Sequence, residues 1–149
     1  MKTPDEQSEV RNFLEMDILS DYKMVEKVRG VILEEAKRAG FVQDEMAELA
    51  VVVNEACANI IEHAYGNDPT RVILVRVRSS LGRIELSFKD FGKKIDTAVL
   101  RASPARLKPN RGFGLLLLQN LTDAVVYDTS MTVGTELKVV KYARSEKIR

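Results

Sequence analysis

Apolar side chains recur at helical spacing along two stretches in the first half of the chain. The first stretch begins near Asp21 and stops before Gly40, a residue suited to end a helix. Its apolar face consists of Val25, Val28, Ile32 and Ala36. The second stretch begins at Asp44, a candidate N-cap, and continues through residues 51–65 to turn residues at 66–69. The pattern therefore predicts two successive amphipathic helices.

Alternation of apolar and polar side chains predicts strands elsewhere in the chain. The predicted strands are residues 10–18, 71–79, 83–89, 123–129 and 135–142. Leu81 and Gly82 turn the chain between the second and third strands, so these two form a hairpin with one buried face.

Between the third and fourth predicted strands, the sequence predicts a short helix, a loop and a second helix. A short apolar helix is expected at residues 97–102, and a loop with two prolines and three cations follows at 103–111. An apolar helix then opens directly after Gly112 and Gly114. The Leu115 to Leu118 run of this helix is expected to lie in the core.

This order of elements predicts an α+β two-layer sandwich, in which helices cover one face of a mostly antiparallel mixed sheet. Strands arrive in adjacent pairs and do not alternate strictly with helices. Neither a GxGxxG nor a GxxxxGK[ST] pattern occurs, which argues against a doubly wound nucleotide fold.

Composition narrows the function classes. A chain of 149 residues is expected to form one domain, with residues 1–9 and 143–149 as loose tails. The balance of 23 basic and 22 acidic residues argues against nucleic acid or a membrane surface as partner. No apolar run approaches the ~20 residues that cross a bilayer, so a cytoplasmic protein is expected. The single cysteine, Cys57, is interpreted as a core residue.

Polar side chains interrupt the apolar pattern of the second helix. Glu55, Asn59 and His63 recur every four residues and so share one face. A carboxylate can accept a proton from an attacking hydroxyl, and an amide oxygen is a ligand for Mg²⁺, a pair of roles that suits phosphoryl transfer. The alternative interpretation is a solvated helix face. His63 either contacts a phosphate or hydrogen-bonds near the helix end, and the structural role is favoured.

Two glycine-containing segments offer further candidates. Asp90 and Gly92 lie at the end of a strand, where Asp90 is either a ligand acceptor or a turn residue. Gly112 and Gly114 open a helix, and bare amides at a helix N-terminus bind phosphate. These two glycines could alternatively serve only close packing of the helix on the sheet.

These motifs, in this order, resemble the ATP-binding domain of gyrase-type topoisomerases, large heat-shock chaperones, sensor histidine kinases and mismatch-repair ATPases, the histidine-kinase-like ATPase fold. The chain is most similar to the small anti-sigma-factor serine kinases. Residues 54–65 resemble their N-box, which implies Glu55 as catalytic base and Asn59 as Mg²⁺ ligand. The segments around Asp90 and Gly114 resemble the two glycine boxes.

The resemblance also implies further roles. Asp90 would accept a hydrogen bond from the exocyclic amine of adenine, Thr135 would support Asp90, and the second box would wrap the phosphates. The residues implied to contact ATP or ADP are Asn59, His63, Asp90, Gly92, Ile95, Arg111, Gly112, Phe113, Gly114, Leu115 and Thr135.

Lys94 departs from the first glycine box of the family, where a second glycine is usual. If that position needs a positive φ, Lys94 strains the loop. The resemblance implies a serine/threonine kinase that acts on a small anti-sigma-factor antagonist and also binds a sigma factor, as a homodimer formed through the first strand and helix. The alternatives are a nucleotide-responsive binding module without phosphoryl transfer, and a domain that has lost nucleotide.

Overall fold

The structure, a computed structural model, describes residues 12–94 and 113–147 and forms one five-stranded sheet in the order β1-β2-β3-β5-β4. The strands are β1 Asn12–Leu19, β2 Val72–Ser80, β3 Arg83–Lys89, β4 Ala124–Asp128 and β5 Glu136–Tyr142. All neighbouring strands are antiparallel. The predicted two-layer α+β sandwich is confirmed, and within the described residues the sheet is purely antiparallel instead of mixed.

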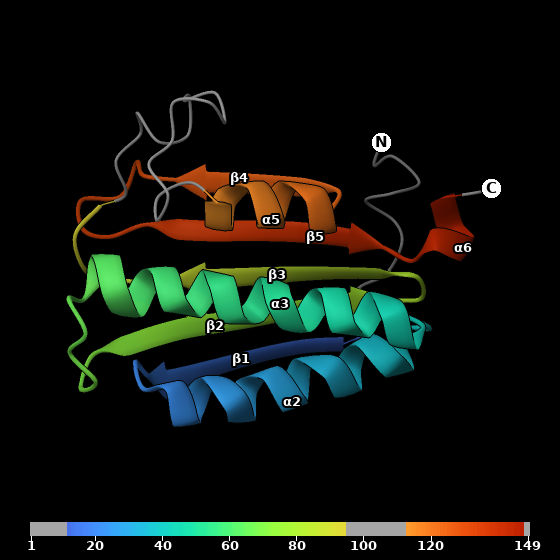
Figure 1. Ribbon diagram of the computed structural model, residues 1–149, viewed down its shortest axis with the longest axis horizontal. Helices are drawn as coiled ribbons and strands as arrows, with labels where there is room; N and C mark the ends of the chain where they lie inside the picture. The colour runs from blue at the N-terminus through green and yellow to red at the C-terminus, as the bar shows by residue number, and fades with distance from the viewer. Residues whose placement is uncertain (1–11, 95–112, 148–149) are drawn as a thin grey trace.

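The helices α2, α3 and α5 lie on the same face of this sheet (Figure 1). The helices are α2 Tyr22–Arg38, α3 Gln43–Asn59, α5 Phe113–Leu121 and the short α6 Arg144–Lys147. A π-helical turn, η1 (Ile60–Ala64), continues α3 directly. The expected helix at 97–102, the loop at 103–111 and the tail at 1–9 lie outside the described residues. None of the described helices is long and apolar enough to cross a bilayer.

The core lies between the sheet and the helices. The period-two alternation of the central strands places Ile73, Val75, Val77, Ile84, Leu86 and Phe88 on the helix side, where each is at most 1% exposed. Helix α3 covers them with its own apolar side chains, which include Cys57. Burial raises the pKa of the Cys57 thiol to about 12, so this cysteine is a core residue as predicted.

One predicted helix boundary needs correction, and another is confirmed. Helix α3 begins at Gln43 with Val42 as its N-cap, so Asp44 lies inside the first turn. The carboxylate of Glu45 replaces the capping side chain, because it accepts a hydrogen bond from the backbone N–H of Val42 at 3.1 Å. Helix α2 ends as expected before Gly40, whose φ is +91°.

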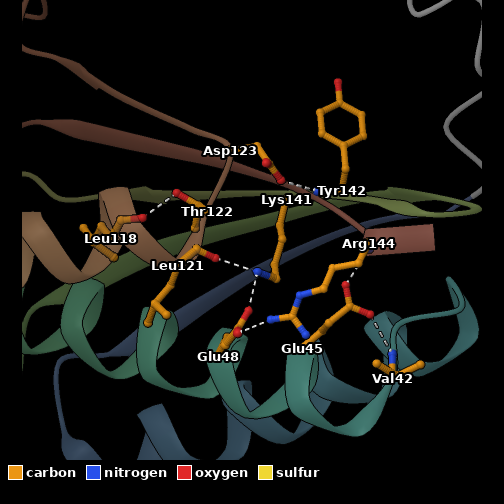
Figure 2. A network of polar contacts seen from close by, with 10 residues as sticks. All are labelled: Val42, Glu45, Glu48, Leu118, Leu121, Thr122, Asp123, Lys141, Tyr142 and Arg144. Atoms are coloured by element: carbon orange, nitrogen blue, oxygen red, sulfur yellow. Dashed lines mark hydrogen bonds and ion pairs between the residues drawn. The ribbon is translucent and has the colours of Figure 1, made fainter. Parts of the chain in front are cut away.

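Residues 143–147 do not form the loose tail that composition predicted. Ala143 is 1% exposed, and the backbone N–H of Arg144 donates to Glu45 at 2.8 Å. The guanidinium of Arg144 pairs with Glu48, which also accepts a 2.7 Å hydrogen bond from the buried Lys141 ammonium (Figure 2). These bonds fasten the chain after β5 to the first turns of α3.

Glu48 makes this fastening sensitive to acid. Burial alone would raise the pKa of Glu48, but the hydrogen bonds and charges of Lys141 and Arg144 lower it below its ordinary value of 4.5. The carboxylate therefore stabilises the fold above about pH 4.5, and this contribution is lost as the pH falls through the lowered pKa. In urea titrations from pH 7 down to 3, the free energy of unfolding of the wild type should fall more steeply than that of Glu48→Gln. Equal slopes would contradict this assignment.

Candidate active site

The first turn of α5 lies directly against the polar row of α3. A Cβ atom added to Gly114 would meet Glu55 Oε2 at 2.7 Å and Asn59 Nδ2 at 3.3 Å. A contact of 2.7 Å is shorter than real Cβ atoms make, so a residue with a side chain at position 114 would displace the carboxylate. Tertiary structure thus brings the acid and the amide together with Gly114, the second residue of α5, which begins at Phe113 and not directly after Gly114 as the sequence predicted.

Glu55 and Asn59 are half-buried and lie one helical turn apart. Within the described part of the chain, no hydrogen bond or ion pair engages either side chain. A carboxylate and an amide oxygen suit Mg²⁺ when phosphate oxygens and waters complete the coordination. The donor set consequently fits the implied ion, and Asn59 Oδ1 is the atom that would hold it.

Tyr127 of β4 is a neighbour of Glu55 that the sequence did not single out. It packs against the core from the helix side of the sheet. Burial raises the pKa of Tyr127 to about 12, and the negative charge of Glu55 adds to this rise. The period-two alternation of residues 123–129 placed Val125 and Tyr127 on one face, which was the available signal.

Asp90 follows β3 and is 4% exposed. Its Oδ1 accepts a hydrogen bond from the backbone N–H of Gly92 at 3.0 Å, and its own N–H donates to the carbonyl of Thr135 at 3.0 Å. Burial raises the pKa of the Asp90 carboxyl, and the N–H groups of Gly92 and Thr135 with the charge of Arg71 offset only part of this rise. The buried Thr135 therefore supports Asp90 through its backbone.

Two glycines let the backbone approach Asp90 and its neighbours closely. A Cβ on Gly134 would lie 1.9 Å from the Asp90 carbonyl oxygen, and Gly134 has a φ of +78°. A Cβ on Gly92 would lie 2.3 Å from the carbonyl oxygen of Ala64, at the end of the π turn. The loop after β3 is thus held against the segment that precedes β5 on one side and against η1 on the other.

Lys94 does not strain this loop. Asn67 is the positive-φ residue other than glycine among the described residues, so Lys94 has an ordinary backbone conformation. Its ammonium donates to the carbonyl of Thr129 at 2.9 Å, which ties the loop to the connection between β4 and β5. The predicted conflict between Lys94 and a positive φ is therefore absent.

The structure describes some of the remaining predicted nucleotide-contacting residues but not others. His63 is exposed within η1, where the helix no longer follows the 3.6-residue repeat that aligned it with Glu55 and Asn59. Phe113 begins α5, and Leu115 is half-buried on that helix. Ile95, Arg111 and Gly112 lie outside the described residues.

Residues 18–141 match a family model described as a histidine kinase-like ATPase domain. The match covers most of the chain and includes both α3 and the start of α5.

The chain is also similar to curated bacterial proteins. It is 28% identical over 145 residues to the serine-protein kinase RsbW of Bacillus mycoides (strain KBAB4), covering 91% of this chain and 88% of the relative. It is 29% identical, with the same coverage, to the serine-protein kinase RsbW of Bacillus cereus (strain AH187).

Two solved structures share the fold. The RsbU and RsbW domains of Rv1364c from Mycobacterium tuberculosis align with a TM-score of 0.63 at 17% identity, covering 88% of this chain and 32% of that one. The SiaB–SiaC complex from Pseudomonas aeruginosa aligns with a TM-score of 0.66 at 14% identity, covering 85% of this chain and 88% of that one. At these identities the likeness concerns the fold alone.

Proposed function

Because the chain belongs to the histidine kinase-like ATPase domain family, we propose that it binds ATP with Mg²⁺ and phosphorylates a serine or threonine of a small protein partner. The single observation that carries this proposal is the contact of Gly114 with Glu55 and Asn59. It joins a candidate base, a candidate metal ligand and a helix N-terminus suited to phosphate. The naming of the curated relatives as serine-protein kinases supports the same class of reaction.

Each residue then has a task. Asn59 would hold the Mg²⁺ ion, which neutralises charge on the phosphates when bound. Glu55 orients the acceptor hydroxyl and takes its proton as the oxygen bonds to the γ-phosphorus, while the bond to the β-phosphate oxygen breaks and ADP leaves. The backbone amides at the start of α5 stabilise the phosphates, and Asp90 accepts a hydrogen bond from the adenine amine.

We further propose an anti-sigma-factor role in partner switching. A sigma factor and a small antagonist would be the protein partners, and the antagonist would be the substrate. The first strand and helix expose large apolar side chains: Phe13 and Leu19 on β1, and Tyr22 and Val31 on α2. This exposure supports a homodimer formed through these two elements.

Nucleotide binding is tested by calorimetry with Mg·ATP and Mg·ADP. The wild type should release heat, and Gly114→Val should weaken ATP binding at least about tenfold, because the added methyl groups displace Glu55 and Asn59. Gly30→Ala is the matched control, since no atom lies within 4 Å of a Cβ built there. No heat with the wild type would refute nucleotide binding. Tight ATP binding without phosphate transfer would instead favour the catalytically silent module.

A further inference from the structure

The end of the N-box helix contains a π-helical turn between Asn59 and Tyr65. The N–H of Tyr65 donates to the carbonyl of Ile60 at 2.9 Å, five residues back, in place of the four-residue spacing of an α-helix. Such a turn holds one extra residue, so the side chains that follow it are rotated relative to a continuous α-helix. Tyr65 is consequently directed inward and is 6% exposed.

The hydroxyl of Tyr65 joins two backbone segments. It accepts a hydrogen bond from the N–H of Phe91 at 2.9 Å and donates to the carbonyl of Val72. The guanidinium carbon of Arg71 lies 4.5 Å from the centre of the Tyr65 ring, and Arg71 also donates to the carbonyl of Phe91 at 3.1 Å. Both residues therefore hold Phe91, which immediately follows Asp90: Tyr65 binds its N–H and Arg71 binds its carbonyl.

Ala64, the last residue of the π turn, holds the same loop. Its carbonyl accepts a hydrogen bond from the N–H of Lys93 at 3.1 Å. Gly92 packs so closely on it that a Cβ would also lie 2.8 Å from Tyr65 Cδ1. Phe91, Gly92 and Lys93 are thus all held by two successive residues of one helix end.

We propose that Tyr65 is a positioning residue for base selectivity, because its hydroxyl holds the loop that presents the Asp90 carboxylate to the nucleobase. This inference rests on the proposed function. The phosphate side of the site is separate, since Gly114 contacts Glu55 and Asn59, which precede the π turn. Loss of the Tyr65 hydroxyl therefore affects recognition of the base more than that of the triphosphate.

The test compares Mg·ATP with Mg·ITP, in which an oxygen replaces the exocyclic amine of the base. Tyr65→Phe keeps the ring beside Arg71 and removes both hydrogen bonds of the hydroxyl. Its preference for ATP over ITP, measured by calorimetry, should fall about tenfold, the effect of one buried hydrogen bond, with ITP affinity unchanged. Tyr142→Phe, at the opposite end of β5 from Thr135, is the matched control and should retain the wild-type preference.

Each result has a defined meaning. A folded Tyr65→Phe protein with the wild-type ATP preference, or with equal losses for ATP and ITP, would overturn the proposal. If Tyr65→Phe does not fold, the exposed Arg71 offers a second variant: Arg71→Met removes the hydrogen bond to the Phe91 carbonyl and the cation above the Tyr65 ring, and its preference for ATP decides whether holding Phe91 sets base selectivity. A wild type that binds neither nucleotide would refute the proposed function itself, whereas a wild type that prefers ATP leaves only the role of Tyr65 under test.

Discussion

Glu55→Gln is expected to bind Mg·ATP about as well as the wild type but to transfer phosphate about 10²- to 10⁴-fold more slowly, the usual contribution of a general base. Glutamine preserves the shape of the side chain beside Gly114 and removes its ability to accept a proton. Glu55 makes no ion pair among the described residues, so the substitution should leave the fold intact.

The measurement uses labelled ATP, Mg²⁺ and a panel of small anti-sigma-factor antagonist proteins, with calorimetry run in parallel. Glu62→Gln is the matched control, because Glu62 is exposed on the same helix end and bonds to Tyr22. Transfer by Glu55→Gln at the wild-type rate would exclude Glu55 as the base. If neither the wild type nor Glu62→Gln phosphorylates any antagonist although both bind ATP, the result would favour the nucleotide-responsive binding module without phosphoryl transfer.

Gly134→Ala should reduce the free energy of unfolding by about 2–5 kcal/mol, since it combines backbone strain with a steric clash. The φ of +78° is unfavourable for alanine, and its Cβ would lie 1.9 Å from the carbonyl oxygen of Asp90. That oxygen belongs to backbone, which cannot move aside as the end of a side chain can. The variant should also lose ATP affinity, because Asp90 is displaced.

The free energy of unfolding is measured by urea titration. Alanine variants of two other glycines separate the effect of backbone strain from that of the steric clash. Gly66 has a φ of +57° but no atom within 4 Å of a built Cβ, so Gly66→Ala reports the backbone strain alone, about 1–2 kcal/mol. Gly30 lies inside α2 with open space around it, and Gly30→Ala should stabilise the protein by about 0.5–1 kcal/mol. If Gly134→Ala lowers the free energy of unfolding no more than Gly66→Ala does, the close approach of Gly134 to Asp90 does not make alanine unfavourable at this position.

Much of the fold was predictable because its signals are local. The repeat of apolar residues placed α2 and α3, and period-two alternation placed the β2–β3 hairpin, since each pattern spans only one element. The one-turn spacing of Glu55 and Asn59 was likewise local. The predicted N-cap at Asp44 was wrong because the carboxylate of Glu45 caps the helix in its place, by accepting a hydrogen bond from the N–H of Val42. Glu45 is held there by the N–H of Arg144, a contact between residues far apart in the sequence.

The sequence by itself therefore determined the elements, their order and the polar row on the central helix. Only the tertiary structure decided which residues from different elements meet: Gly114 lies beside Glu55, the N–H of Phe91 donates to the Tyr65 hydroxyl, and Lys141 pairs with Glu48 from 93 positions away. Periodicity reports which face of an element is buried, whereas contacts between elements depend on how the whole chain packs. The π turn that directs Tyr65 also lacks a sequence pattern of its own, because Ile60–Ala64 consists of residue types that are equally common in an α-helix.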